Sequence, residues 1–354
     1  MFPNQLRELT MDAALRDMEH PDPRVRSVAA DALGSAPPDR AEEACVALRT
    51  ALDDGRPDVR YAAALSLGEL ADGEAVDRLV HMLEDRDIMP RQAAAISLGR
   101  IGDKAGVEPL INALAEGPPD VRFQAISSLV ELDGVRAVAP LMVALEDHDP
   151  EVRGSAAAGL GDLEAHEAAD AIAGLLGDTL ETVRVEAAYA LGRLRDPRGL
   201  PALVKLTTHR DFGYMVCELL GRLGNPEAVP ALERAQRRFF LHPVTRLRAA
   251  ASLIRLGETA SRAYLLRACR SWRSDVRGLA FELLGEVGGP GAREALVLGL
   301  RGKSTDAAVR GLGLLGDRSV IPTLAEGLLK ARELGDEDLA TDIETAIARL
   351  ERVK

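Results

Sequence analysis

The sequence predicts an all-α solenoid of about ten helical hairpins followed by a C-terminal capping helix. Three observations carry this prediction: a recurring phrase with a nearly constant period, the length of the chain and its composition. The 354 residues exceed the usual size of a single globular core, which favours several domains or one elongated repeat array. Apolar residues make up 47% of the chain but aromatic residues only 3%. The interior must therefore consist of Ala, Leu and Val, whose small volumes suit close helix packing.

The recurring phrase is visible by eye and contains one arginine in each copy. It reads "DPRVRSVAADALG" up to Gly34, "PDVRYAAALSLG" up to Gly68 and "ETVRVEAAYALG" up to Gly192. Its arginine recurs at spacings of 34, 31, 31, 31 and 31, as Arg26, Arg60, Arg91, Arg122, Arg153 and Arg184. The register continues less regularly, at spacings of 33, 31 and 28, through Gly213, Arg246, Arg277 and Thr305. Such a period indicates a stacked array, here of ten units.

Each unit reads as two antiparallel helices. The second helix begins beside a capping Asp, Thr or Pro, as at Asp22-Pro23 and Asp149-Pro150. The first helix, such as "VEPLINALAE", follows a turn rich in Gly and Asp, and we expect most of the glycines to end helices. One hairpin cannot bury its apolar stripe alone, so neighbouring hairpins must stack.

The array is predicted to extend over residues 1–335, with about 31 residues in each repeat. The polar, amphipathic segment 336–354 lacks the repeat phrase and is predicted to form the capping helix that the end of an array needs.

The phrase D-P-x-V-R-x-x-A-A-x-x-L-G, followed by G-D-x-x-A-V-x-P-L, resembles the HEAT-like repeats of phycobilisome lyases. The resemblance covers nearly the whole chain, and it implies the fold more strongly than the function. It also implies that the arginine of the phrase ties neighbouring hairpins together through an acidic partner in a turn. That structural role is carried over to Arg60, Arg91, Arg122, Arg153 and Arg184.

Composition and motifs indicate a cytoplasmic protein that is not an enzyme. The net charge of -12 opposes binding to nucleic acid or to anionic membranes, and no segment is apolar enough to predict a membrane-spanning helix or a signal peptide. The three cysteines predict neither a disulfide framework nor a metal pair. No catalytic motif, metal site or cofactor site is predicted, because the histidines and acidic pairs are scattered over separate turns.

The irregular stretch from residue 205 to 277 is the predicted partner-binding region. It contains 14 Lys or Arg and 6 Asp or Glu, net +8, and six of the eleven aromatic residues of the chain. Basic residues interleaved with aromatic ones are typical of binding hot spots. We select Phe212, Tyr214 and Trp272 as candidate contacts, although bulky residues here could equally fill space around an irregular hairpin.

A column of charged residues follows the glycine of the phrase, and it supplies three further candidates. Stacking of equivalent positions predicts a basic ladder of Arg193, Arg222 and Arg255, with Glu131 and Asp162 beside it. The ladder could bind an acidic peptide or a phosphate, or it could be a solvated face paired with the acidic units.

These features predict a protein-interaction scaffold whose second helices line a concave surface. Its expected partner is another protein with an acidic or phosphorylated segment, and the sequence does not determine the oligomeric state. Two alternatives remain: a bilin (chromophore) lyase-like protein, by family resemblance, and a nucleic-acid-binding HEAT-like protein.

Overall fold

The computed structural model describes residues 10–352 and divides into two compact helical units, residues 1–194 and 195–354. The predicted array and cap begin and end in residues 1–9 and 353–354, which lie outside the described residues. Within residues 10–352 the regular elements are all helices, as predicted, and no β-strand occurs. The all-α solenoid fold is thereby confirmed.

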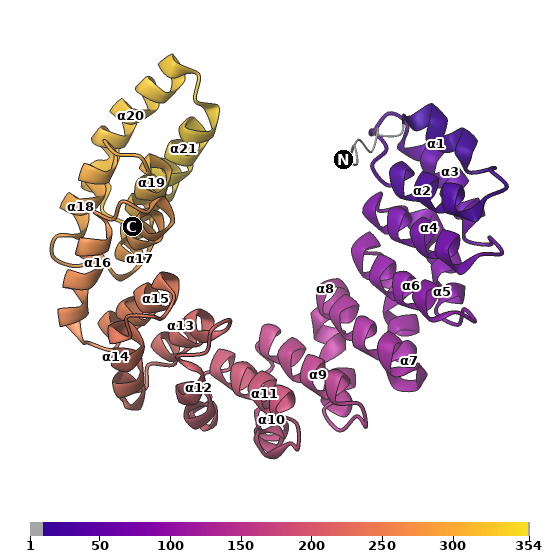
Figure 1. Cartoon of the computed structure of the whole chain (residues 1–354), viewed down its shortest axis with the longest axis horizontal. Helices are drawn as coiled ribbons and strands as arrows, with labels where there is room; N and C mark the ends of the chain where they lie inside the picture. Colours follow the sequence, from indigo (N-terminus) through magenta and orange to yellow (C-terminus); the bar gives the residue numbers. More distant parts are fainter. Residues whose placement is uncertain (1–9, 353–354) are drawn as a thin grey trace, which may run out of the picture. The chain divides into compact units, whose positions relative to one another are not determined.

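The first unit contains six stacked hairpins, coloured from indigo to magenta-pink in Figure 1. Its helices are α1 Met11–Asp17, α2 Pro23–Leu33, α3 Ala41–Ala51, α4 Pro57–Glu69, α5 Val76–Met82, α6 Ile88–Ile101, α7 Val107–Glu116, α8 Pro119–Ala144, α9 Pro150–Asp162, α10 Ala169–Gly174 and α11 Glu181–Arg193. Helix α8 joins the second helix of one hairpin to the first helix of the next, and non-helical backbone at Asp133 marks the kink between them.

The second unit contains four hairpins and a closing helix pair. Its helices are α12 Leu200–Leu206, α13 Gly213–Leu223, α14 Val229–Arg237, α15 Pro243–Arg255, α16 Arg262–Ala268, α17 Ser274–Val287, α18 Ala292–Gly299, α19 Thr305–Leu315, α20 Ile321–Leu334 and α21 Glu337–Arg352. The last helix, α21, falls in the segment predicted to be the cap and packs against α19 and α20. The division of the chain at residue 335 stays a prediction.

The predicted capping hydrogen bonds occur at α2 and α9, whereas no side-chain hydrogen bond caps α4, α6 or α11. Asp22 accepts a hydrogen bond from the backbone N–H of Arg24 at the start of α2, and Asp149 accepts from Glu151 and Val152 at the start of α9. Each aspartate is followed by a proline in the first helical turn, where a missing N–H costs nothing. Small side chains, chiefly Ala and Leu, fill the core of each unit.

The glycine of the phrase has a different role from the expected one. Gly99 lies inside α6, and a Cβ atom there would come within 2.8 Å of the Cβ of Ser128 on the next second helix. The Ser128 hydroxyl donates to the carbonyl oxygen of Ala95 at 2.8 Å. The glycine therefore permits close approach of two backbones. Similarly crowded phrase glycines are Gly68, Gly161, Gly221 and Gly285. Other glycines do end helices in the left-handed conformation, as expected: Gly102, Gly224, Gly316 and Gly335.

Candidate protein-binding surface

The arginine of the phrase forms a clamp between neighbouring hairpins in three of the regular units. Arg60 donates from Nε and Nη2 to both carboxylate oxygens of Asp85 at 2.7 Å, while its Nη1 donates to the carbonyl oxygen of Asp54 at 2.8 Å. The same fork joins Arg122 to Asp147 and Arg153 to Asp178. These three arginines hold the positions that their predicted structural role requires. An earlier clamp, Arg26 to Asp54, follows the same pattern.

Two arginines of the phrase lack the acidic partner. Arg91 and Arg184 keep the Nη1 hydrogen bond, to the carbonyl oxygens of Asp85 and Asp178 at 2.8 and 2.7 Å. Neither forms an ion pair within residues 10–352, and Nε of Arg91 is buried with no acceptor among them. The structural role of these two arginines stays a prediction.

The predicted arginine ladder consists of paired charges. Arg193 forms an ion pair with Asp162, and Arg255 with Glu286, so equivalent positions of neighbouring hairpins do stack. Arg222 pairs within its own helix with Glu218 at 2.6 Å. A ligand anion would have to compete with these carboxylates, which makes the ladder a weaker anion site than its sequence indicates. Partner binding at these arginines stays a prediction.

The candidate aromatic residues lie at the turns of the second unit. Phe212 is 43% exposed and Tyr214 39%, while Trp272 is 91% exposed. Phe239 and Phe240, which were not selected as contacts, are 78% and 95% exposed. Their position in "RRFFLHP", after two arginines and two to three residues before the capping residue of α15, could have marked them as turn residues. Tyr264 instead packs beneath the guanidinium of Arg246, 5.4 Å from the ring centre.

Three successive turns bring four of the exposed aromatic residues to one edge of the second unit. Residues 207–212, 238–242 and 269–273 each connect the first helix of a hairpin to the second, just before α13, α15 and α17. Helix α15 packs against both α13 and α17, so these turns succeed one another along the stack (Figure 1). We call these three turns the turn edge. It exposes Phe212, Phe239, Phe240 and Trp272.

Basic side chains accompany the aromatic ones along the turn edge. Arg210, Arg238 and Arg270 are exposed and have no acidic partner among the described residues. Arg273 pairs with Asp275 at 2.6 Å, and Arg237, at the end of α14, pairs with Glu233 at 3.3 Å. Several large aromatic rings are thus exposed to water next to unpaired arginines. Monomeric proteins seldom expose such rings together, because apolar surface is costly to leave in water, so this surface is a candidate binding site.

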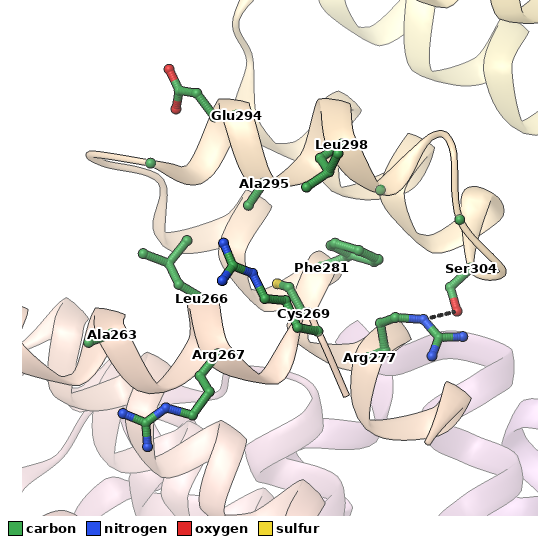
Figure 2. Close-up of a pocket in the computed structure, with 14 residues that line it drawn as sticks. Ala263, Leu266, Arg267, Cys269, Arg277, Phe281, Glu294, Ala295, Leu298 and Ser304 are labelled. Atoms are coloured by element: carbon green, nitrogen blue, oxygen red, sulfur yellow. Dashed lines mark hydrogen bonds between the residues drawn. The ribbon is translucent and has the colours of Figure 1, made fainter. Parts of the chain in front are cut away.

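A pocket of about 610 Å³ lies beside the last of these turns, bounded by α16, α17 and α18 (Figure 2). Its lining includes the apolar side chains of Leu266, Phe281 and Leu298. Cys269 also lines it, but burial raises the pKa of this thiol to about 12, so it is not a nucleophile near neutral pH. The pocket therefore offers no activated thiol.

No other chemistry emerges from the described residues. No group of three His, Cys, Asp or Glu side chains in residues 10–352 could bind a metal ion. His209 stacks on Phe212 with 4.9 Å between ring centres, and its Nδ1 accepts from the backbone of Asp211. In the same residues, no helix is both long and apolar enough to cross a membrane.

Comparison with known proteins identifies the family. The model of HEAT repeats matches residues 11–99, 46–129, 107–184 and 172–238, and the model of the PBS lyase HEAT-like repeat matches residues 306–330. The chain belongs to the HEAT-repeat family, as the resemblance of its phrases implied. No curated protein matches it in sequence.

Two solved structures share this fold, and a third is less similar in structure. Kap95 in a complex with Nup1 is 13% identical to this chain, with a TM-score of 0.60. The match covers 96% of this chain and 57% of Kap95. The YibA protein of Escherichia coli is 20% identical, with a TM-score of 0.53. The match covers 71% of this chain and 93% of YibA. The phycocyanin lyase complex of CpcE and CpcF from Nostoc is 24% identical over 81% of this chain and 98% of that one, with a TM-score of 0.39.

Proposed function

We propose that this chain is a non-enzymatic scaffold of the cytoplasm that binds another protein through the turn edge of its second unit. The observation that carries the proposal is the exposure of Phe239, Phe240 and Trp272 on successive turns. Burying each ring in an interface would remove a large apolar area from water, and aromatic residues of this kind dominate binding energies.

The flanking arginines indicate what kind of partner this surface suits. Arg210, Arg238 and Arg270 have no acidic partner within the described chain, in contrast with the clamp arginines of the first unit. A partner with acidic side chains around an apolar centre would complement them, and the charges would speed association more than they would tighten it. A fold shared with Kap95, whose solved complex contains Nup1, is compatible with such a role.

The test is affinity capture from the native host with three versions of the protein. The first is wild type, the second combines Phe239→Ser, Phe240→Ser and Trp272→Ser, and the third combines Val135→Ser and Val143→Ser. The third is a matched control, because those two valines of α8 are 89% and 76% exposed and belong to the first unit, whereas the turn edge belongs to the second. We expect a protein that is retained by wild type and control and lost by the aromatic variant. Equal retention by all three would refute the assignment of the surface.

Nucleic-acid binding is an alternative that these variants do not distinguish from protein binding. Stacking of bases on exposed aromatic rings would also be lost in the aromatic variant. A gel-shift experiment at low salt with single-stranded and duplex DNA is expected to show no complex with wild type, because the whole chain has a net charge of -12.

A further inference from the structure

One clamp of the second unit is incomplete in a specific way. In the regular clamps, Nη1 donates to the preceding turn, and Nε and Nη2 together donate to an aspartate. Arg277 keeps the first hydrogen bond, to the carbonyl oxygen of Ser271 at 2.7 Å. Its Nε donates to the hydroxyl of Ser304 at 3.1 Å, and its Nη2 has no acceptor among the described residues. A serine with one acceptor oxygen thus stands where an aspartate with two would complete the fork.

The pocket beside α16 opens where this aspartate is missing. Figure 2 shows Arg277 and Ser304 at one end of the space and Leu266, Leu298 and Phe281 around it. Arg267 and Arg270 also line the pocket and have no acidic partner among the described residues, whereas Glu294 is the single acidic lining residue. The lining therefore has a net charge of +2 together with an apolar wall.

The first unit contains a comparable groove with the opposite charge. Arg91 is also a clamp arginine without an aspartate, and it lines a cavity of about 520 Å³ next to α5 and α7. That cavity is lined by Glu84, Asp85 and Glu116, so its net charge is -2. Absence of the aspartate thus accompanies a groove in both places, but only the groove at Arg277 is basic.

We propose that the groove between α16 and α18 binds a carboxylate of the partner protein, from an Asp or Glu next to an aliphatic or aromatic residue. The carboxylate accepts from Nη2 of Arg277 and from Arg267 or Arg270, which restores the fork that the repeat makes elsewhere. The neighbouring apolar side chain rests against Leu266 and Leu298. The groove adjoins the turn edge, because Arg277 holds the turn that contains Trp272. This inference rests on the proposed function and names the chemistry of its partner.

The probe is a set of fluorescent, N-acetylated pentapeptide amides of the form Gly-X-Glu-Z-Gly, in which X and Z are Leu, Ile, Val, Met or Phe. Each has a counterpart with Gln in place of Glu, which is similar in size and uncharged. Fluorescence anisotropy with the full chain is expected to show Glu peptides that bind about ten-fold more tightly than their Gln counterparts.

Substitutions at the two exposed arginines and at the buried Ser304 locate this preference. The combination Arg267→Gln and Arg270→Gln changes exposed side chains only, and it is expected to remove most of the ten-fold preference. Ser304→Asp supplies the missing carboxylate within the chain and is expected to abolish the preference, whereas Ser304→Asn is expected to retain it. Arg91→Gln, in the acidic groove of the other unit, is the matched control and is expected to change nothing.

Equal binding of Glu and Gln peptides to wild type would overturn the proposal. So would a preference that survives both Ser304→Asp and the double arginine variant. Capture of a partner through Phe239, Phe240 and Trp272 is measured in a different experiment from peptide binding. If the aromatic variant loses the partner while the peptides show no preference for Glu, the proposed function holds and the carboxylate groove is wrong.

Discussion

Replacing Gly99 by Ala tests the close packing of second helices most sharply. The added Cβ would lie 2.8 Å from Cβ and Oγ of Ser128 and 3.0 Å from its Cα, which is backbone and cannot rotate away. Inserting a methyl group into a packed contact costs about 1–3 kcal/mol. Ala is better than Gly inside a helix by about 1 kcal/mol, which offsets part of that cost. We expect a net loss of up to about 2 kcal/mol in the free energy of unfolding.

Gly174 provides the matched control, because it lies in α10 and a Cβ atom added there would meet no other atom within 4 Å. There the Gly→Ala change should stabilise by up to about 1 kcal/mol. Urea unfolding of both variants, followed by circular dichroism, gives the two values. If Gly99→Ala is as stable as Gly174→Ala, the second helices do not approach as closely as described.

Three further predictions concern the clamps, the thiols and the arginine column. Hydrogen bonds from Arg26 hold the pKa of Asp54 below its ordinary value; burial alone would raise the pKa of Asp85 and Asp147, but Arg60 and Arg122 outweigh it. Carboxylates with lowered pKa values stabilise the fold above about pH 4, and this contribution is lost as the pH falls. The free energy of unfolding of Arg60→Gln should therefore depend less on pH in the acid range than that of wild type. At pH 7 the same variant should lose about 3 kcal/mol of that free energy. Because burial raises the pKa of Cys45 to about 11 and those of Cys217 and Cys269 to about 12, Ellman's reagent should label none of them within minutes at pH 8 unless urea is added. Affinity for the captured partner should fall as the salt concentration is raised. If the arginine column takes part, charge reversal by Arg222→Glu and Arg255→Glu should also weaken that affinity. An affinity that neither salt nor charge reversal changes would remove the column from the site.

Much of the fold could be predicted because the same sequence pattern recurs in successive repeats. The arginine recurs at a fixed position in the regular units, and its spacing requires that equivalent side chains meet in neighbouring hairpins. The clamps at Arg60, Arg122 and Arg153 follow from that regularity. The role of Gly99 was missed, since a glycine near the end of a helix resembles a stop signal until the neighbouring Ser128 is seen.

The site was less predictable, because it depends on where the repeat is broken. The pairing of Arg193 with Asp162 and of Arg255 with Glu286 follows from the direction of long side chains, which the order of charges along a column does not determine. Exposure of Phe239 and Phe240 depends on how the turn before α15 is held. The groove at Arg277 depends on Ser304, the residue before α19, where the spacing of the repeat falls from 31 to 28.

Photo-crosslinking from the turn edge tests the central claim most directly. A photoreactive phenylalanine analogue replaces Phe240 in one version of the chain and Val143 of α8 in another, both in the native host, because these side chains are 95% and 76% exposed. The account predicts a discrete crosslinked protein from position 240 that is absent from position 143. The same crosslinks from both positions, or none from position 240, would contradict it.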